Sequence, residues 1–286
     1  MTKKELAMKP IIFQKMHGLG NDFVVIDSRD DNLFINTELV KSLADRHCGV
    51  GFDQLAVIYK SKKTGAAAKL DFWNCDGSKS ATCGNATRCV AKLLMDEKKS
   101  NEIKLMTSHA VLSCKRLSND KISVNMGQPR SSWKDIPLTE SCDTLHLPLE
   151  GKPVATNIGN PHCTFFVEDI KKYNLEKIGT TYENHRLFKK KTNVQIAQVL
   201  SPKSIRVRVW ERGVGVTMAS GSSACAVAFA AKRLKLVGKK TEIILDGGKL
   251  DIELRNDEIW MSGPTAHIFQ GTLSNEFFAS MIKGTG

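Results

Sequence analysis

The chain has 286 residues and a mass of 31.6 kDa, long enough for one large core or two domains of ordinary size. Apolar residues make up 41% and charged residues 25%, which excludes a disordered chain, a collagen-like fibre and a disulfide-knotted miniprotein. No run approaches the roughly 20 apolar residues that cross a bilayer. The N-terminal sequence MTKKELAMKPIIF also lacks the apolar stretch of a secretory signal. We therefore expect a cytoplasmic protein with no membrane partner.

The formal net charge is +12, and the excess of positive charge is spread along the chain. Short lysine-rich runs at 60–63, 189–191 and 239–240 lie beside turn-like residues, and aromatic residues make up only 7%. Runs of this kind usually form solvated loops, whereas single-strand nucleic-acid surfaces combine basic grooves with aromatic side chains. We expect no nucleic-acid partner. The non-enzymatic alternative is a basic nucleic-acid-binding module, whose affinity would fall steeply with salt.

The chain contains eight cysteines, none of them in a CxxC pair. In a chain of this length without a signal sequence, they indicate reduced thiols. The lack of CxxC spacing argues against a structural zinc site, so we expect no metal and keep thiol chemistry open. The cysteines occupy positions 48, 75, 83, 89, 114, 142, 163 and 225.

Strand-like runs dominate the chain, and several alternate apolar with polar residues as half-buried strands do. Helical patterns are fewer and cover 37–47, 84–97, 221–236 and 274–283. Strands in runs with occasional helices favour an α+β fold over a doubly wound parallel sheet. Neither the dinucleotide-binding glycine motif nor a P-loop is present. In chain order the strand-like runs are 11–18, 22–28, 54–60, 68–74, 101–108, 110–116, 121–127, 163–169, 193–200, 204–210, 241–248, 250–256 and 258–263.

The clearest organisational signal is an internal repeat. In each copy a strand ends in Trp and one polar residue, and nine residues later a small residue precedes a glycine and an alanine-rich helix. Asn74 and Cys83 of the first copy match Glu211 and Ser220 of the second. The match predicts a duplicated domain with pseudo-twofold symmetry. The two copies are FWNCDGSKSATCGNATRCVAKLL (72–94) and VWERGVGVTMASGSSACAVAFAAKRL (209–234).

Cys83 precedes Gly84 and Asn85 at the predicted start of a helix. The free backbone N–H groups of a helix N-terminus favour an anion, and the helix dipole adds to this effect. The same groups lower the pKa of a thiol. We therefore predict a thiolate at Cys83 that is reachable near neutral pH.

The second copy offers the same cradle at Gly221 and Ser222, with the hydroxyl of Ser220 in place of the thiol. Two such helix starts facing one cleft would hold a carboxylate and take up negative charge, as a reaction at carbon α of an amino acid requires. Each start alone has an ordinary structural explanation, since Ser is a common N-cap and a Cys there is usually inert. The duplication favours a catalytic pair.

Five blocks of the sequence carry a family resemblance. They are KMHGLGNDFVVID (15–27), RHCGVGFDQL (46–55), NCDGSKSATCGNATRC (74–89), GNPHC (159–163) and ERGVGVTMASGSSAC (211–225). In their order and spacing they resemble the signature blocks of diaminopimelate epimerase across essentially the whole chain. The resemblance implies two similar domains, each a curved, mostly antiparallel sheet wrapped around a central helix. We expect the first domain at 1–126, completed by 271–286, and the second at 127–270.

The resemblance also implies an activity, the cofactor-independent epimerisation of LL-diaminopimelate to meso-diaminopimelate in lysine and peptidoglycan precursor biosynthesis. The family uses neither pyridoxal phosphate nor a metal, so backbone N–H donors stabilise the developing charge. One base removes the proton from carbon α and a second group delivers a proton to the opposite face. Cys83 matches one base, Ser220 occupies the position of the other, and His162 and Glu211 match residues that tune or orient the thiols. We expect no cofactor and a homodimer.

Further residues match the family's substrate-holding positions. They would bind the carboxylates and the distal amino-acid group of a two-headed substrate. A smaller amino acid would leave such buried polar groups unpaired, at about 1–3 kcal/mol each. The matching residues are Asn21, Gln54, Asn74, Gly84, Asn85, Asn160, Asn193, Glu211, Arg212, Gly221 and Ser222.

Ser220 is the departure from the family pattern that matters, because the family has Cys there and a hydroxyl is a far weaker acid than a thiol. Three explanations stay open: a Cys→Ser substitution made by design, a natural variant with another proton carrier, or the loss of two-base epimerisation. The alternative carrier would be water held by Glu211 or His162. A protein that lost one base would be a related racemase or a one-base eliminase acting on another amino acid.

Overall fold

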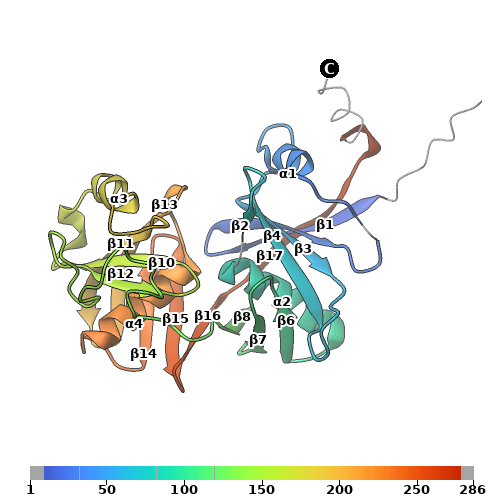
Figure 1. The fold of residues 1–286 in the computed structure, drawn as a ribbon. Coiled ribbons are helices and arrows are strands. Elements are labelled where there is room, and N and C mark those ends of the chain that lie inside the picture. The colour runs from blue at the N-terminus through green and yellow to red at the C-terminus, as the bar shows by residue number, and fades with distance from the viewer. Residues whose placement is uncertain (1–9, 32, 81–82, 119, 278–286) are drawn as a thin grey trace, which may run out of the picture.

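The structure is a computed structural model that describes residues 10–31, 33–80, 83–118 and 120–277. Two lobes stand side by side, one around helix α2 (Gly84–Lys98) and one around helix α4 (Gly221–Arg233) (Figure 1). Each helix buries most of its residues in its own apolar core and is wrapped by strands. The predicted α+β class, with two similar halves built on a central helix, is confirmed.

In the described residues of the first half there are eight strands and two helices, and most neighbouring strands are antiparallel. The parallel pairs are β2 with β3 and β4 with β6. Its elements are β1 (Ile11–Gly18), β2 (Asn21–Asp27), α1 (Thr37–Ala44), β3 (Gln54–Tyr59), β4 (Ala68–Asn74), β5 (Lys79–Ser80), α2, β6 (Glu102–Met106), β7 (Val111–Arg116) and β8 (Lys121–Asn125).

The second half repeats this pattern strand for strand. Its parallel pairs are β10 with β11 and β12 with β14, at the corresponding places in the order. Its elements are β9 (Val154–Asn157), β10 (Pro161–Phe166), the 3₁₀ turn η1 (Ile170–Lys172), α3 (Leu175–Glu183), β11 (Asn193–Ser201), β12 (Ser204–Glu211), β13 (Gly215–Thr217), α4, β14 (Lys240–Leu245), β15 (Gly248–Arg255) and β16 (Glu258–Pro264).

The two halves join where β8 pairs antiparallel with β16, the strands that hold the same place in each copy. At this seam Ser262 faces Ser123, and their buried hydroxyls are 2.9 Å apart. The last strand, β17 (Ala266–Leu273), has no counterpart and returns to pair with β1. The red C-terminal strands therefore run from one half to the other (Figure 1). The pairing of β17 with β1 begins at Ala266. The predicted domain limits at 126, 127, 270 and 271 stay predictions.

Three predicted helices are present, with different ends. The first stops at Ala44 rather than at 47, because Asp45 leaves the helical conformation and its carboxylate accepts from the next N–H groups. The third stops at Arg233 rather than at 236, two residues before Lys235 adopts a positive φ. The predicted helix at 274–283 begins with helical residues 275–277, and its remainder lies outside the described residues.

Helix α3 and strands β5, β9, β13 and β17 were absent from the sequence-based interpretation. Helix α3 has an apolar stripe of Leu175, Ile178 and Tyr182, but it spans only nine residues and only Leu175 of the three is fully buried, so the pattern is short. Strand β17 has no buried face over 267–270, so its sequence lacks alternation. Within the described ranges no helix is both long and apolar enough to span a bilayer.

Candidate functional site

The N-termini of α2 and α4 converge on one methionine at the seam. Met261 in β16 lies against both first residues: a Cβ added to Gly84 would lie 2.7 Å from its Cε, and one added to Gly221 would lie 2.8 Å from its Sδ. A Cβ on Gly221 would also lie 3.5 Å from Asn85 Oδ1, on the other helix. Glycine at both starts allows this approach. The two predicted carboxylate cradles therefore adjoin.

Cys83 is the N-cap of α2, with an extended backbone and its Sγ accepting from Ala86 N at 3.3 Å. Its side chain is partly exposed. Burial raises the pKa of the Cys83 thiol to about 12, and the negative charge of Glu211 adds to this, while the N–H of Ala86 and the charge of Arg88 oppose it. The predicted lowering of this pKa is therefore wrong for this arrangement. The helix N-terminus acts in the expected direction, but desolvation is stronger.

Ser220 is the N-cap of α4 and is buried, but its hydroxyl makes no capping bond to the helix. It lies instead beside the carboxyl group of Glu211. Burial raises the pKa of Glu211 above its usual value, hydrogen bonding to neighbouring hydroxyls including Ser220 opposes this, and the charge of Asp53 adds to it. Glu211 therefore holds a proton more readily than an exposed glutamate does.

His162 is fully buried, and both of its ring nitrogens have partners. Gln195 Nε2 lies 3.0 Å from Nδ1, and Asn160 Oδ1 lies 2.8 Å from Nε2. Because Gln195 Oε1 accepts from Thr164, its Nε2 must donate, which makes Nδ1 the acceptor and Nε2–H the donor to Asn160. Burial, with the charge of Arg212, lowers the pKa of His162 to about 3. The imidazole is therefore a neutral group in one tautomer.

Asn193 and Arg212 are occupied by structural bonds around the same loop. Asn193 Nδ2 donates to Pro161 O at 3.0 Å, and its Oδ1 accepts from Arg212 N at 3.0 Å. Arg212 Nη1 donates to Lys190 O at 2.7 Å. These bonds tie the strand ends that carry Asn160 and Glu211 to one another.

The first half holds its predicted residues through charges. Asn21 Nδ2 donates to Asp53 Oδ2 at 2.8 Å, and Asn21 Oδ1 lies 3.3 Å from Asn85 Nδ2. Arg46 forms an ion pair with Asp53 at 3.0 Å and one with Asp22 at 2.8 Å. A substrate that binds Asn21 or Asn85 must exchange their mutual bond for its own.

Gln54 and Asn74 face each other as register partners on β3 and β4. Gln54 Nε2 donates to Asn74 Oδ1 at 2.8 Å, and Asn74 Nδ2 donates to Ser78 at 3.0 Å. In the first turn of α4, Gly221 is buried and Ser222 half-buried.

The strand registers relate the predicted residues of the two halves as pairs. Phe23 lies opposite Gln54 in one half as His162 lies opposite Asn193 in the other. His162 thus occupies the place of a buried phenylalanine, which fits its neutral state. The pairs related by register are Asn21 and Asn160, Gln54 and Asn193, and Asn74 and Glu211. Position at the helix starts relates Cys83 to Ser220 and Asn85 to Ser222.

Arg88, Asp53 and Gln195 contact the predicted residues but were not singled out from the sequence. Arg88 and Asp53 both lie inside the quoted blocks, which could have drawn attention to them. Gln195 lies outside those blocks and gives no such signal.

Comparison with known proteins places the chain in a family. A family model described as diaminopimelate epimerase matches residues 13–131 and 154–268. The chain is 44% identical over 267 residues to the diaminopimelate epimerase of Rhodospirillum centenum, covering 92% of each chain. It is 42% identical over 264 residues to that of Pelagibacter ubique, covering 89% of this chain and 95% of the relative. The chain belongs to the diaminopimelate epimerase family.

Solved structures with the same fold are more distant from this family member in sequence. A probable proline racemase from Agrobacterium radiobacter has a TM-score of 0.68 at 13% identity, covering 95% of each chain. A phenazine biosynthesis protein of the PhzF family from Bacillus anthracis has a TM-score of 0.67 at 13% identity, covering 93% of this chain and all of the other. These likenesses show the fold alone.

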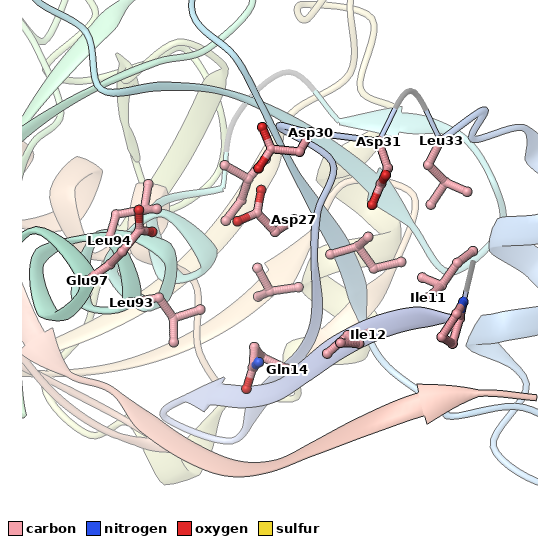
Figure 2. Close-up of a pocket in the computed structure, with 14 residues that line it drawn as sticks. Ile11, Ile12, Gln14, Asp27, Asp30, Asp31, Leu33, Leu93, Leu94 and Glu97 are labelled. Atoms are coloured by element: carbon pink, nitrogen blue, oxygen red, sulfur yellow. The ribbon is translucent and has the colours of Figure 1, made fainter.

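A large cavity of this protein lies away from the N-termini of α2 and α4. It measures about 730 Å³, and Figure 2 shows it between strand β1 and the C-terminal part of α2, with several acidic side chains around it. Its lining includes Ile12, Gln14, Asp27, Leu93 and Glu97 and none of the predicted site residues. Across the described ranges, no three His, Cys, Asp or Glu side chains group as metal ligands would.

Proposed function

We propose that the protein epimerises LL-diaminopimelate to meso-diaminopimelate at carbon α, a step in lysine and peptidoglycan precursor biosynthesis. The observation that carries the proposal is the convergence of Cys83 and Ser220, as N-caps of two symmetry-related helices, on Met261. A diaminopimelate epimerase relative is also similar to this chain in sequence over 92% of its length. An isomerase with a small-molecule substrate follows.

The cradle for the reacting carboxylate is the pair of helix starts. The first N–H groups of a helix have no intrahelical acceptor, so those of Gly84, Asn85, Gly221 and Ser222 face the seam as donors. Both helix dipoles favour an anion at this point. Donors fixed before the reaction stabilise the charge that develops when carbon α loses its proton, so the chemistry proceeds without a cofactor.

The polar side chains around the seam suit the distal end of the substrate. Asn21, Asn74, Asn160 and Asn193 offer amide groups, and Arg212 offers a cation for the second carboxylate. In the present arrangement these side chains bond to other groups of the protein. A two-headed amino acid can replace those bonds in full, whereas a short amino acid leaves several unpaired.

On the face opposite Cys83, we propose that Glu211 and Ser220 act together as the proton carrier. His162 is unsuited to the role, since both ring nitrogens are occupied and burial lowers its pKa to about 3. Glu211 has a raised pKa and lies beside Ser220. As Cys83 takes the α-proton, Ser220 passes its own proton to carbon α and receives that of Glu211. The reverse reaction returns each proton.

Ser220 stands where a second thiol would be needed, which favours one other candidate, a one-base racemase or eliminase acting on another amino acid. Proton NMR in deuterated water, with LL- and meso-diaminopimelate supplied separately, distinguishes the two. We expect deuterium at carbon α together with interconversion of the isomers. Exchange of one isomer without inversion would establish the one-base reaction instead. Inertness of both isomers would contradict diaminopimelate as the substrate.

We also propose that the protein is a homodimer that pairs through β17. Residues 267–270 of this strand are exposed on both faces, and Ile12, Ile268 and Phe269 stand 51%, 51% and 46% exposed. A second copy would cover these apolar side chains. Sedimentation velocity should show a dimer that Phe269→Glu dissociates, and a monomer at all concentrations would contradict it.

A cytoplasmic location is a further proposal, supported by eight cysteines that are all free thiols.

A further inference from the structure

Arg88 is the largest fully buried side chain of the structure, with 0% of its surface exposed. It lies in the second turn of α2, five residues after Cys83. A buried guanidinium is costly unless it is paired and fully hydrogen-bonded. The mechanism proposed above assigns Arg88 no role, so its presence at this place needs an explanation.

The guanidinium of Arg88 is only partly satisfied. Nη1 donates to Asn85 Oδ1 at 2.9 Å and lies 3.6 Å from Met261 Sδ. Nε and Nη2 have no hydrogen-bond partner in the part of the chain that the structure describes. No described carboxylate forms an ion pair with it; the charges that act on it are those of cysteine thiols. The cation therefore has no counterion while those thiols are protonated.

Two glycines make room for this guanidinium on the strands of the seam. A Cβ added to Gly18, at the end of β1, would lie 3.1 Å from Nη2. A Cβ added to Gly263, in β16, would lie 3.2 Å from Cζ and 3.3 Å from Nε. Neither glycine has a positive φ, so space rather than backbone conformation accounts for them. The pocket around Arg88 is thus built from three segments far apart in the sequence.

Three thiols act electrostatically on Arg88, namely Cys83 and Cys89 on α2 and Cys225 on α4. Cys89 and Cys225 are 0% exposed in the two apolar cores, and burial raises the pKa of each to about 12. Cys83 alone is partly exposed. Of the three, it is the thiol that substrate can reach. The other charge acting on Cys83 is that of Glu211, which opposes ionisation.

We infer that Arg88 is a positioning residue: its guanidinium fixes the amide of Asn85 and places a buried positive charge behind the Cys83 thiolate. With Oδ1 held by Nη1, the Nδ2 of Asn85 is directed toward Asn21, on the substrate side. Ionisation of Cys83 then gives the guanidinium its missing counter-charge. The inference rests on the proposed function in taking Cys83 as a base.

Only the first half has an arginine at this position of its central helix. Arg88 follows Cys83 by five residues, and the residue five after Ser220 is Cys225. Glu211 stands beside Ser220 instead. The half that must form a thiolate holds a buried cation, and the half with the hydroxyl holds a carboxyl group.

The test is the rate of Cys83 alkylation by iodoacetamide between pH 7 and 9.5, read from the Cys83 peptide by mass spectrometry. Because no substrate is used, the result is independent of whether diaminopimelate is turned over. We expect Arg88→Met to slow alkylation at each pH by about tenfold, since an adjacent charge shifts a pKa by about one unit or more. Arg88→Lys should stay within about twofold of the unchanged protein, because it keeps the charge.

Internal controls are the exposed Cys48 and Cys75, whose rates should not change in any variant. Lys92→Met, one turn further along α2, is the matched loss of a partly exposed cation and should leave the Cys83 rate unchanged. A folded Arg88→Met with the rate profile of the unchanged protein would overturn the inference. If Arg88→Met does not fold, Arg88→Lys decides: a loss of tenfold or more there contradicts the role of charge. In turnover assays, Arg88→Lys should raise KM more than it lowers kcat, because the orientation of Asn85 is lost.

Discussion

The two halves of the molecule have the same strand order but hold their site residues by different means. In the first half, Asn21 is held by Asp53, which is paired with Arg46 and linked through it to Asp22. Burial alone would raise the pKa of Asp22, but hydrogen bonds and charges from Arg46 and Lys15 lower it to about 2. This part of the first half is an ionic network.

In the second half the equivalent positions are held by neutral groups. His162, Gln195, Thr164 and Ser223 form a buried chain of hydrogen bonds around Asn160. The difference teaches that duplication preserved the frame, that is, the strand pairing and the two helix starts, while the side chains diverged. In the mechanism we propose, acid–base chemistry is divided between a thiol with Arg88 behind it and a hydroxyl beside Glu211.

Removal of the Cys83 thiol should have the largest effect on the reaction. Cys83→Ala should lower epimerisation by about 10⁴-fold, at the upper end of what a positioned base contributes. Exchange of the α-proton in deuterated water should disappear for the isomer that Cys83 deprotonates. Unchanged exchange of both isomers would contradict its assignment as a base.

A thiol at position 220 should give the second half the same kind of acid–base group that the first half has at position 83. We expect Ser220→Cys to raise the rate of epimerisation by about 10²-fold, because a thiol ionises far more readily than a hydroxyl. The rate is followed by NMR as isomer interconversion. Ser222→Cys places the same thiol two residues away and serves as the control. No gain from Ser220→Cys would show that the proton carrier lies elsewhere.

Replacing the carboxyl group of the second half should sharpen the assignment of its proton carrier. Glu211→Gln should slow epimerisation by about tenfold or more while exchange at the Cys83 face persists. In the direction in which Glu211 donates, the rate in the unchanged protein should fall as pH rises through its raised pKa, and Glu211→Gln should lack this fall. A fall that persists in the variant would point to another group.

The smallest expected effect is on the free energy of unfolding. It tests whether the second half is held by neutral groups, in contrast to the ionic first half. An unfolded histidine takes up a proton below about pH 6.5, whereas folded His162 does so only near pH 3. The contribution of His162 is therefore complete above pH 6.5 and is lost as pH falls toward 3. Urea unfolding should show a free energy that declines more steeply with acid than in His162→Gln, by about 1.4 kcal/mol per pH unit. Equal slopes would contradict a neutral buried His162.

The frame could be predicted from the sequence because it depends on local patterns. The spacing from Trp73 to Cys83 and from Trp210 to Ser220 already predicted the duplication, and the glycines after them predicted the helix starts. The hydrogen-bond partners could not be predicted in this way, since Gln195 meets His162 only through the pairing of β10 with β11. Burial is likewise a tertiary property, which is why the pKa of Cys83 was predicted in the wrong direction.

The pairing of β1 with β17 has a consequence for how the chain is made. Ile11 lies opposite Leu273, so nearly the whole polypeptide must leave the ribosome before the first strand acquires its second neighbour. Until then β1 pairs with β2 alone and presents an open edge, which is a template for unwanted association between nascent chains. Expression at low temperature or with a holdase chaperone should therefore raise the yield of the full-length protein, and truncation before Ala266 should lower it.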